Sequence, residues 1–511
     1  MKKILFSLIF IGIFTSCHDI FLEEKSYSQI SIENSFKTAE DAVMAVNGAY
    51  SMLAGENYYD NIYMLLADGP ADQMLTEWTN PLDNYVNLNN TNKDVQSFWN
   101  AAWKVNAQTN LIMEKVPNIE MDLTLKNRIL GEASFIRALN YFHLVRFFGN
   151  IPLITKTTTE VESMKVEQVN SEKIYEQIIL DLDFASKNLP EIYEGSDLGR
   201  ATSWAAKALL AKVYLTMAGY HADPATSELI KGDKENYKKC ADLCYEIITS
   251  GKFDLFENFA DIYENENENI KEDIFSIQYL DGAGGYSGGV GTTKTPRFVP
   301  KGSKLAAVEW KTYAVEKMFY ENFPNDDRKA ATFLVSYLDE NDALVTMPSA
   351  VLPYPFVRKF LSDIHEGSDK QYKAVDAKDY GDNYIVLRYA DVLLMYSEAL
   401  NDYYGPEYNN GEIENTLYGI NKVRTRAGSR AYTLADCNTD QDVLRTMILD
   451  ERCWELCFEG HGWFDYVRHG VLIERLLMAG RAINVAQHNY LMPIPFNATQ
   501  TNKLLKQNNG Y

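Results

Sequence analysis

The sequence predicts a mostly α-helical protein, with tetratricopeptide-like helix pairs forming a right-handed scaffold and a loop-rich middle region containing short strands. Apolar residues recur three and four positions apart over both ends of the chain, which is the period of an amphipathic helix. Six prolines between about residues 253 and 380 disfavour long helices there. Hydrophobic residues make up 46% of the chain and charged residues 23%, so we expect a large core.

A secretion signal precedes the folded part of the chain. Lys2 and Lys3 form a charged start, and residues 4–14 form an apolar stretch that is too short to span a bilayer. The stretch ends in Phe14-Thr15-Ser16-Cys17, which resembles a bacterial lipobox, the site where a cysteine is acylated and becomes the mature N-terminus. We therefore expect residues 1–16 to be removed and Cys17 to tether the protein to a membrane through its acyl chains.

Helices are expected throughout the N-terminal half. The first opens at Thr38, where a capping pattern precedes apolar residues at helical spacing, and Gly55 follows as a stop signal. The next covers residues 97–116. The helix over residues 125–148 is apolar around most of its circumference, so we expect it to be largely buried. Further helices are expected over residues 171–189, 202–218 and 235–250.

The middle region and the C-terminal third follow different patterns. Residues 274–279 are typical of a strand, and a glycine-rich loop over residues 282–291 comes next. Long loops of this kind in a compact chain are usually functional. Helices resume over residues 383–403, 413–427, 440–459 and 463–477. Small and large apolar residues alternate in segments such as 205–211, which favours close helix pairing, although no strict repeat of about 34 residues is visible.

Charge and cysteine content exclude some classes of function. The chain has 49 basic and 71 acidic side chains, a formal charge of −22, so nucleic acid is not expected as a partner. Five cysteines follow Cys17, and we expect them to be small buried hydrophobic residues rather than disulfides or zinc ligands. No cofactor or metal is expected, although Asp326 and Asp327 leave a calcium site open.

Several segments, taken in order, carry a family resemblance. Residues 137–153 read RALNYFHLVRFFGNIPL, residues 199–202 GRAT, and residues 387–400 LRYADVLLMYSEAL. Residues 421–428 read NKVRTRAG, residues 451–468 include ER and ELCFEGHGWFDYVR, and PIP and QNNGY stand near the end. Together with the lipobox cysteine, this series resembles the SusD/RagB family of outer-membrane nutrient-binding lipoproteins. Gly462 stands where that family usually has an arginine.

The resemblance implies an organisation and a function. After the signal, residues 17–511 would form a single SusD-like domain with an N-terminal half, 17–250, and a C-terminal half, 251–511. Such a protein would lie on the cell surface, tethered to the outer membrane, and would have no catalytic site. It would bind an oligosaccharide, or a peptide, and pass it to a SusC-like TonB-dependent transporter. His18-Asp19 and Glu23-Glu24 resemble the acidic export signal of such lipoproteins.

Two loops have the composition of a saccharide site, because sugars are bound by flat aromatic faces together with amide or carboxylate groups. SusD relatives carry ligand contacts in the region of the first loop, where we rank Trp78 first, with core packing as the alternative for this residue. In the second loop Tyr286 is the ring that we expect to be exposed, whereas Tyr313 should pack in the core. The full candidate set is Trp78, Asn80, Asp83, Asn84, Tyr85, Tyr279, Tyr286 and Trp310.

The family signature residues are expected to support the fold rather than to bind ligand. Arginines and carboxylates on different helices would form buried ion pairs, and losing one partner would leave a costly unpaired charge. His461 would cap carbonyls at a helix end. The signature set is Arg388, Arg424, Glu451, Arg452, Glu459, Trp463 and Asp465.

Two other functions remain as alternatives. A glycoside hydrolase would need two carboxylates at a defined separation, and no pattern here positions such a pair. Residues 285–289 spell G-x-S-x-G, but the strand, turn and helix that this hydrolase motif requires are missing from the pattern. The other alternative is a helical scaffold that binds only proteins.

Overall fold

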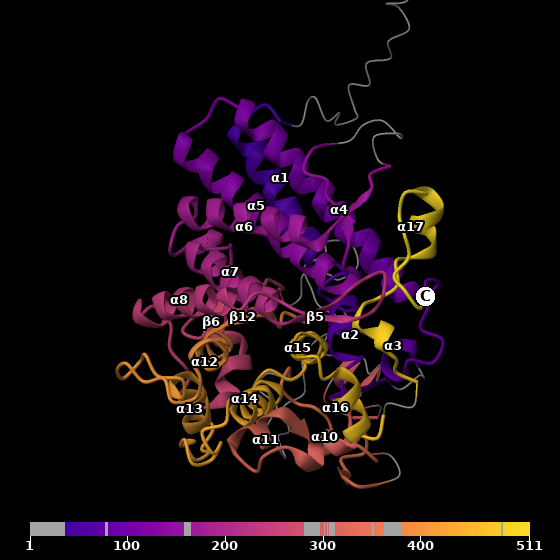
Figure 1. Ribbon diagram of the computed structural model, residues 1–511, viewed down its shortest axis with the longest axis vertical. Helices are drawn as coiled ribbons and strands as arrows, with labels where there is room; N and C mark the ends of the chain where they lie inside the picture. Colours follow the sequence, from indigo (N-terminus) through magenta and orange to yellow (C-terminus); the bar gives the residue numbers. More distant parts are fainter. Residues whose placement is uncertain are drawn as a thin grey trace, which may run out of the picture.

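The computed structural model of the chain describes residues 36–76, 80–157, 165–280, 297–300, 302–303, 305, 312–349, 352–361, 380–481 and 484–511. Within these ranges helices dominate, and the strands are short and pair only in twos, all antiparallel (Figure 1). This confirms the predicted fold class of helix pairs around a strand-containing middle region.

The N-terminal helices pack in chain order. In Figure 1 they descend from α1 at the top to α8. Each helix contacts the next in the order α1, α4, α5, α6, α7 and α8, and α1 also packs on α5. All six helices expected here are present, and each starts within four residues of its predicted start. They are α1 (Ala39–Leu53), α4 (Lys93–Lys115), α5 (Leu123–Phe148), α6 (Ser171–Asn188), α7 (Ser203–Ala218) and α8 (Glu235–Thr249).

Side-chain caps explain where these helices begin. The Thr38 hydroxyl accepts a hydrogen bond from Asp41 N at 3.3 Å, and the Asp41 carboxylate accepts one from Thr38 N at 2.9 Å. Helix α4 starts four residues before the predicted position because Asn92 caps it, accepting from two backbone N–H groups. Helix α5 is buried on every side after its first turns, as its apolar sequence predicts.

The C-terminal third corrects three predicted boundaries. The expected helix 383–403 begins instead with strand β12 (Tyr384–Arg388), which pairs with β6 (Asp273–Ile277) before α12 (Tyr389–Tyr404) starts. A short apolar run fits either structure, and a partner strand decides which one forms. The helix predicted over 463–477 breaks at Gly470, whose φ of 73° ends α15 (Gly462–His469) before α16 (Leu472–Met478). Helix α13 (Tyr418–Arg426) starts five residues later than predicted.

The remaining elements are mostly short. Helix α14 (Gln441–Glu455) ends four residues earlier than predicted. The other α-helices are α2 (Ile62–Asp68), α3 (Pro81–Asn84), α10 (Lys317–Asn322), α11 (Asp327–Thr332) and α17 (Phe496–Thr501). The other strand pairs are β1 (Met74–Thr76) with β7 (Tyr313–Val315), β2 (Ile151–Pro152) with β3 (Gln168–Val169), β4 (Tyr220–Ala222) with β5 (Leu229–Lys231), β8 (Phe333–Leu334) with β11 (Phe356–Val357), and β9 (Ser336–Leu338) with β10 (Leu344–Thr346). The 3-10 turns are Val116–Asn118, Gly195–Asp197, Phe259–Tyr263, Asn265–Asn267 and Gln487–Tyr490.

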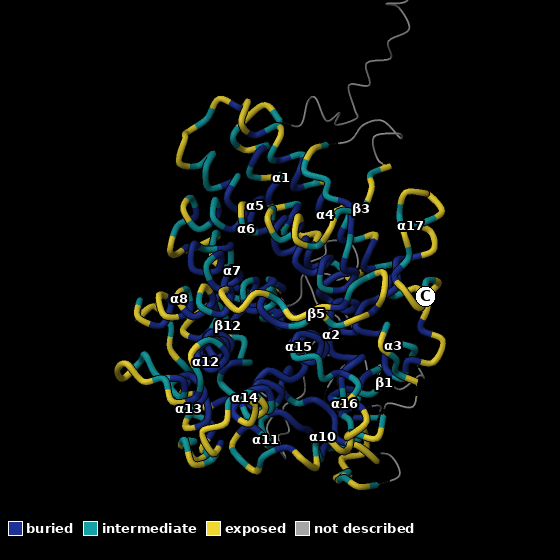
Figure 2. The backbone as a smooth tube through the Cα atoms, in the orientation of Figure 1, coloured by how far each residue is buried: buried dark blue, intermediate teal, exposed yellow. Residues whose placement is uncertain are grey.

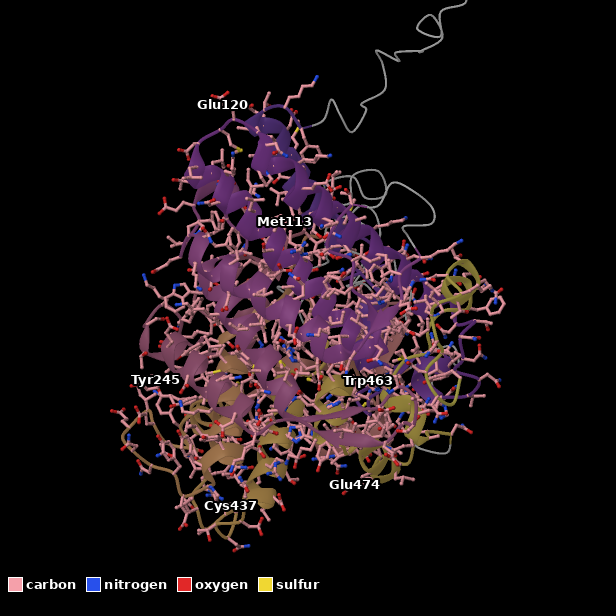
Figure 3. All side chains as sticks on the ribbon, turned by 45° about the horizontal axis from the view of Figure 1, so that its top comes forward. Met113, Glu120, Tyr245, Cys437, Trp463 and Glu474 are labelled. Atoms are coloured by element: carbon pink, nitrogen blue, oxygen red, sulfur yellow. The ribbon has the colours of Figure 1, made fainter. Side chains whose placement is uncertain are left out.

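A continuous apolar core joins the two halves of the chain. One cluster of buried side chains runs from Ala42 to Ile494, and the buried backbone occupies the middle of the molecule in Figure 2. Trp463 is fully buried within it, whereas Glu120 and Glu474 lie at the margins (Figure 3). The helices at the two ends of the chain are therefore stabilised by the same core.

The five cysteines after Cys17 are buried and unpaired, as expected. Cys240 and Cys244 lie closest to each other, with their Sγ atoms 4.0 Å apart on successive turns of α8. This distance is about twice that of a disulfide bond. Burial raises the pKa of the Cys457 thiol to about 12, so it stays protonated at neutral pH.

Candidate functional site

Four candidate residues from the first loop form or support the turn at α3. The Asn80 side chain caps this helix, accepting from Leu82 N at 2.9 Å, and Asn84 accepts from Val86 N at 2.8 Å. Both asparagines are half-buried. The buried Asp83 carboxylate accepts two hydrogen bonds from Thr76.

Two further contacts hold this turn in place. Asp83 also forms an ion pair with Arg481. Tyr85 is only 5% exposed, and its hydroxyl donates to the Pro70 carbonyl at 2.5 Å. Asp83 and Tyr85 are thus part of the support of the loop, and neither offers a free face to a ligand in this conformation.

The second loop is described only in part. Tyr279 is 7% exposed, and its hydroxyl donates to the Ala54 carbonyl at 3.1 Å, so its ring packs in the core. Tyr313 is buried, as expected, and its hydroxyl donates to the Asn61 side chain at 2.6 Å. Three candidate aromatic residues and the lipidation residue lie outside the described residues: Trp78, Tyr286, Trp310 and Cys17.

Strands β1 and β7 join two of the aromatic segments at one place. Thr76, the last described residue before segment 77–79, pairs directly with Tyr313 in the antiparallel register. Thr312, the first described residue after segment 306–311, lies next to Tyr313 in the chain. The described residues next to the segments of Trp78 and Trp310 therefore lie together at this strand pair.

The ends of the third aromatic segment reach the same region. Arg297, the first described residue after segment 281–296, accepts a hydrogen bond at its carbonyl from Thr312 N at 2.9 Å. Its guanidinium forms an ion pair of 3.4 Å with Glu56. Tyr279, near the other end of the segment, contacts Ala54 as described above. The loop between α1 and α2, residues 54–61, thus contacts residues beside segments 281–296 and 306–311, and Tyr313 links it to Thr76 beside segment 77–79. We call this region the aromatic-loop face.

The signature residues lie in a buried cluster of ion pairs around Arg388. Its guanidinium contacts Glu272, Glu455 and Glu459, each at 2.7 Å. Burial raises the pKa of Glu459, but Arg388 and Lys359 outweigh it and hold this pKa at about 2. Other arginines extend the cluster through Glu451: Arg328 at 2.7 Å and Arg424 at 2.7 Å.

A second group of buried pairs lies at the start of α15. Arg452 contacts Asp391 at 2.8 Å and Asp465 at 2.9 Å, and Arg468 contacts Asp465 at 2.9 Å. His461 immediately precedes α15, where unpaired N–H groups rather than carbonyls need partners, so the expected carbonyl cap was wrong. Its Nδ1 atom lies 3.2 Å from Lys212 Nζ instead.

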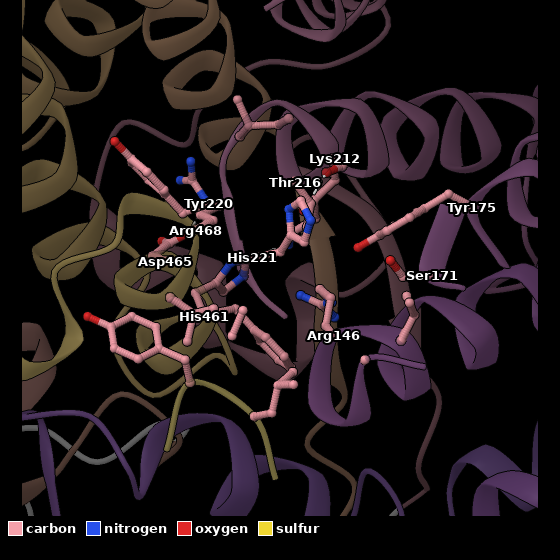
Figure 4. Close-up of a pocket in the computed structure, with 18 of the residues that line it drawn as sticks. Arg146, Ser171, Tyr175, Lys212, Thr216, Tyr220, His221, His461, Asp465 and Arg468 are labelled. Carbon is pink, nitrogen blue, oxygen red and sulfur yellow. Dashed lines mark hydrogen bonds and ion pairs between the residues drawn. The ribbon is translucent and has the colours of Figure 1, made fainter. Parts of the chain in front are cut away.

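The structure also contains a pocket that the sequence analysis missed (Figure 4). It encloses about 60 Å³ and lies where α5, α6, α7, β4 and α15 meet. Polar groups that line it include Arg146, Tyr175, Lys212, His221 and His461. Only the RFFG exit of α5, residues 146–149, and the signature before α15 are recognisable motifs, and neither indicates that the two would face each other.

Two observations concern the described part of the chain as a whole. None of its helices is both long enough and apolar enough to cross a membrane. It contains no group of three or more histidine, cysteine or acidic side chains arranged to hold a metal ion. Asp326 is one of the two residues for which the sequence left calcium binding open. It caps α11 and forms an ion pair with Arg328 at 2.6 Å.

Two family models match this chain. One is described as the SusD family and matches residues 271–511, and the other, described as starch-binding and associating with the outer membrane, matches residues 20–215. SusD-like protein P25 of Formosa agariphila is 28% identical over 97% of each chain. A SusD-like protein of Bacteroides ovatus is 25% identical over 89% of this chain and 80% of its own length.

Solved structures agree with the sequence relatives. A SusD superfamily protein from Parabacteroides distasonis is 26% identical and superposes with a TM-score of 0.76 over 92% of this chain and 99% of its own. A laminarin-binding SusD-like protein is 25% identical, with a TM-score of 0.74 over 93% of this chain and 100% of its own. The motif series, the helical fold and these matches lead to one conclusion: the chain belongs to the SusD/RagB family.

Proposed function

We propose that this protein captures a nutrient, most simply an oligosaccharide, at the cell surface and delivers it to a SusC-like TonB-dependent transporter. The observation that carries the proposal is the aromatic-loop face, where described residues next to the segments containing Trp78, Tyr286 and Trp310 lie together. Family membership supports the same function. In this proposal residues 1–16 are a signal, and acylated Cys17 holds the single domain 17–511 on the outer membrane.

The chemistry of the face suits a sugar. Indole and phenol rings can pack against the C–H surface of a pyranose, and amides can exchange hydrogen bonds with its hydroxyls. Asn80 and Asn84 are half-buried near the first segment, on a turn held by Asp83 and Tyr85. A rigid support of this kind lowers the entropy lost when the ligand binds.

The carboxylates around the face favour binding over hydrolysis. A glycoside hydrolase needs one carboxylate as acid and another as base or nucleophile. Glu56 and Asp83, which lie at the loop ends, are each ion-paired with an arginine, Arg297 and Arg481 respectively. We therefore propose that the protein is not an enzyme.

Titration calorimetry of the mature protein tests the ligand class. Laminarin, the ligand in the description of one relative, and starch oligosaccharides are the first probes, with a peptide mixture as the alternative. Trp78→Ala and Trp310→Ala should each weaken saccharide binding about tenfold, because a central aromatic contact is typically worth 1–2 kcal/mol. Tyr404→Ala is the matched control, since this ring is 46% exposed on α12, which has no part in the aromatic-loop face.

The outcomes separate the alternatives. Binding of peptides but of no saccharide would redirect the ligand class, and binding of neither would favour a scaffold for proteins. Turnover of a chromogenic glycoside that disappeared on replacing one carboxylate would indicate a hydrolase. Purification of the tagged protein from detergent-solubilised outer membranes tests the partner, and a co-purifying TonB-dependent barrel is the expected result.

A further inference from the structure

Arg146, at the end of α5, carries a positive charge that no carboxylate of the described residues balances. Its guanidinium donates to the Phe142 carbonyl at 3.2 Å and contacts His143 Nδ1 at 2.7 Å. The rings of Phe142 and Phe464 lie 3.9 Å and 3.6 Å from it. Among the described residues no carboxylate lies within 4.0 Å of this side chain. A half-buried cation without a counterion is costly, so Arg146 would be stabilised by an anion.

The neighbouring charged side chains are paired with one another, and none of them balances the charge of Arg146. The cations are Lys212, Arg452 and Arg468, and the anions are Asp391, Asp465 and Glu398. They are connected in one set of ion pairs, in which Lys212 contacts Asp391 at 3.0 Å. Burial and the charge of Lys212 hold the pKa of His461 at about 3, so this imidazole is neutral.

Hydrogen-bond donors converge on the space in front of Arg146. In Figure 4 the Tyr175 hydroxyl and the ring of His221 face the same space as this guanidinium. The Ser171 hydroxyl lies beside them and donates to Asn170 Oδ1 at 3.3 Å. Neither the Tyr175 hydroxyl nor the His221 ring forms a hydrogen bond with another described residue. Helix α6 begins at Ser171 and adds the positive end of its dipole. The carboxylate lining the pocket, Asp465, is already paired with two arginines.

The pocket has room for a compact group. Its volume of about 60 Å³ exceeds the ~10–15 Å³ that one water molecule needs. His221 is exposed, so the pocket opens to solvent beside it. Apolar side chains, among them Val145, Leu215 and Leu491, complete the wall. A ligand here would meet the Arg146 guanidinium, hydroxyls, imidazoles and apolar groups.

We propose that this pocket binds an oxyanion group, a carboxylate, phosphate or sulfate, with Arg146 as its countercharge and Tyr175 and His221 as donors. An anion of this kind would balance the charge of Arg146 and accept charge-assisted hydrogen bonds from its guanidinium. The group could belong to a free ion or to an acidic sugar. The pocket lies on α5, α6 and β4, none of which contributes a residue to the aromatic-loop face, so the proposal goes beyond the proposed capture of neutral saccharide.

Calorimetry at constant ionic strength tests the pocket with sodium phosphate, sodium sulfate and sodium glucuronate, and with glucose as the uncharged comparison. The wild type should bind at least one of the anions saturably. Arg146→Gln should weaken that binding at least about tenfold, because charge-assisted hydrogen bonds are lost. Arg430→Gln is the matched control, since this arginine is largely exposed and is paired with Asp436. It should bind as the wild type does.

Two further variants keep the test decisive if Arg146→Gln does not fold. Tyr175→Phe and His221→Ala each remove one donor at the mouth, and each should weaken anion binding severalfold. Tighter binding of glucuronate than of phosphate and sulfate would assign the site to an acidic sugar, and the reverse order to a free inorganic ion. The proposal is overturned if the wild type shows no saturable binding at millimolar anion, or if all these variants bind as the wild type does.

Discussion

The N-terminal helices and the C-terminal signature region are stabilised in different ways. Helices α5, α6 and α7 pack through apolar side chains, with Ile136, Ile178 and Leu209 almost completely buried. The signature region buries charges instead, around Arg388 on β12 and Arg452 on α14. The first region has buried pairs as well, such as Arg137 with Asp181 at 2.7 Å, but they are fewer.

This difference determines how each region responds to change. Apolar contacts are many and individually small, so shortening one side chain leaves a cavity that its neighbours can partly fill. Buried charges depend on specific partners, and removing one leaves the others without compensation. The helix layer should therefore tolerate conservative substitution better than the signature region does.

Arg388→Met should give the largest loss of stability. Glu272, Glu455 and Glu459 would remain buried without their shared cation, at a cost of about 3–5 kcal/mol. Urea unfolding followed by circular dichroism measures it. Ile178→Val in α6 is the comparison, with an expected cost of about 0.5–1.5 kcal/mol. Equal losses in the two variants would contradict the distinction between the regions.

Acid should weaken the signature region next. The pKa of Glu459 is held at about 2, below its ordinary value of 4.5, and that of Asp465 at about 2, below 3.8, by neighbouring arginines that outweigh burial. A lowered carboxyl pKa contributes stability that is complete above the ordinary value and is lost as pH falls toward 2. Each group should contribute about 2–3 kcal/mol, seen as a falling urea midpoint between pH 5 and pH 2.

Asp68, on α2, offers a control of opposite sign. Its carboxylate accepts hydrogen bonds from Gly460 N and Gly462 N, but burial raises its pKa to about 7. Stability from this group is present at low pH and is lost as pH rises through 7. Asp68→Asn should flatten the stability profile between about pH 4 and 7 and leave the acid limb in place. A change in the acid limb would show that the two groups are coupled.

The smallest effect is expected at the start of the helix layer. Thr38→Ala removes the side-chain cap of α1 and should cost about 1 kcal/mol, measured as a lower urea midpoint. Thr425→Ala is the matched control, because this threonine is exposed within α13 and its hydroxyl bonds only to carbonyls of its own helix. Alanine favours helix at such a position, so no loss is expected there.

Local sequence determined most of the helices. Caps such as Thr38 and Asn170, stop signals such as Gly149, and the period of apolar residues act within a few positions, so they can be read without the fold. The family motifs, likewise, identified the family. The same patterns failed at β12, because a strand needs a partner, and β6 lies more than a hundred residues earlier in the chain.

Tertiary structure alone decided which residues meet. The sequence contains Arg388 and Glu459 but does not pair them, and it gives no sign that Tyr85 and Tyr279 are buried or that Arg146 faces Tyr175 across a pocket. Periodicity records how each element faces the core, whereas the partner of a buried charge depends on how distant elements pack. Helix positions were therefore available from the sequence, and the ion pairs, the aromatic-loop face and the pocket required the folded chain.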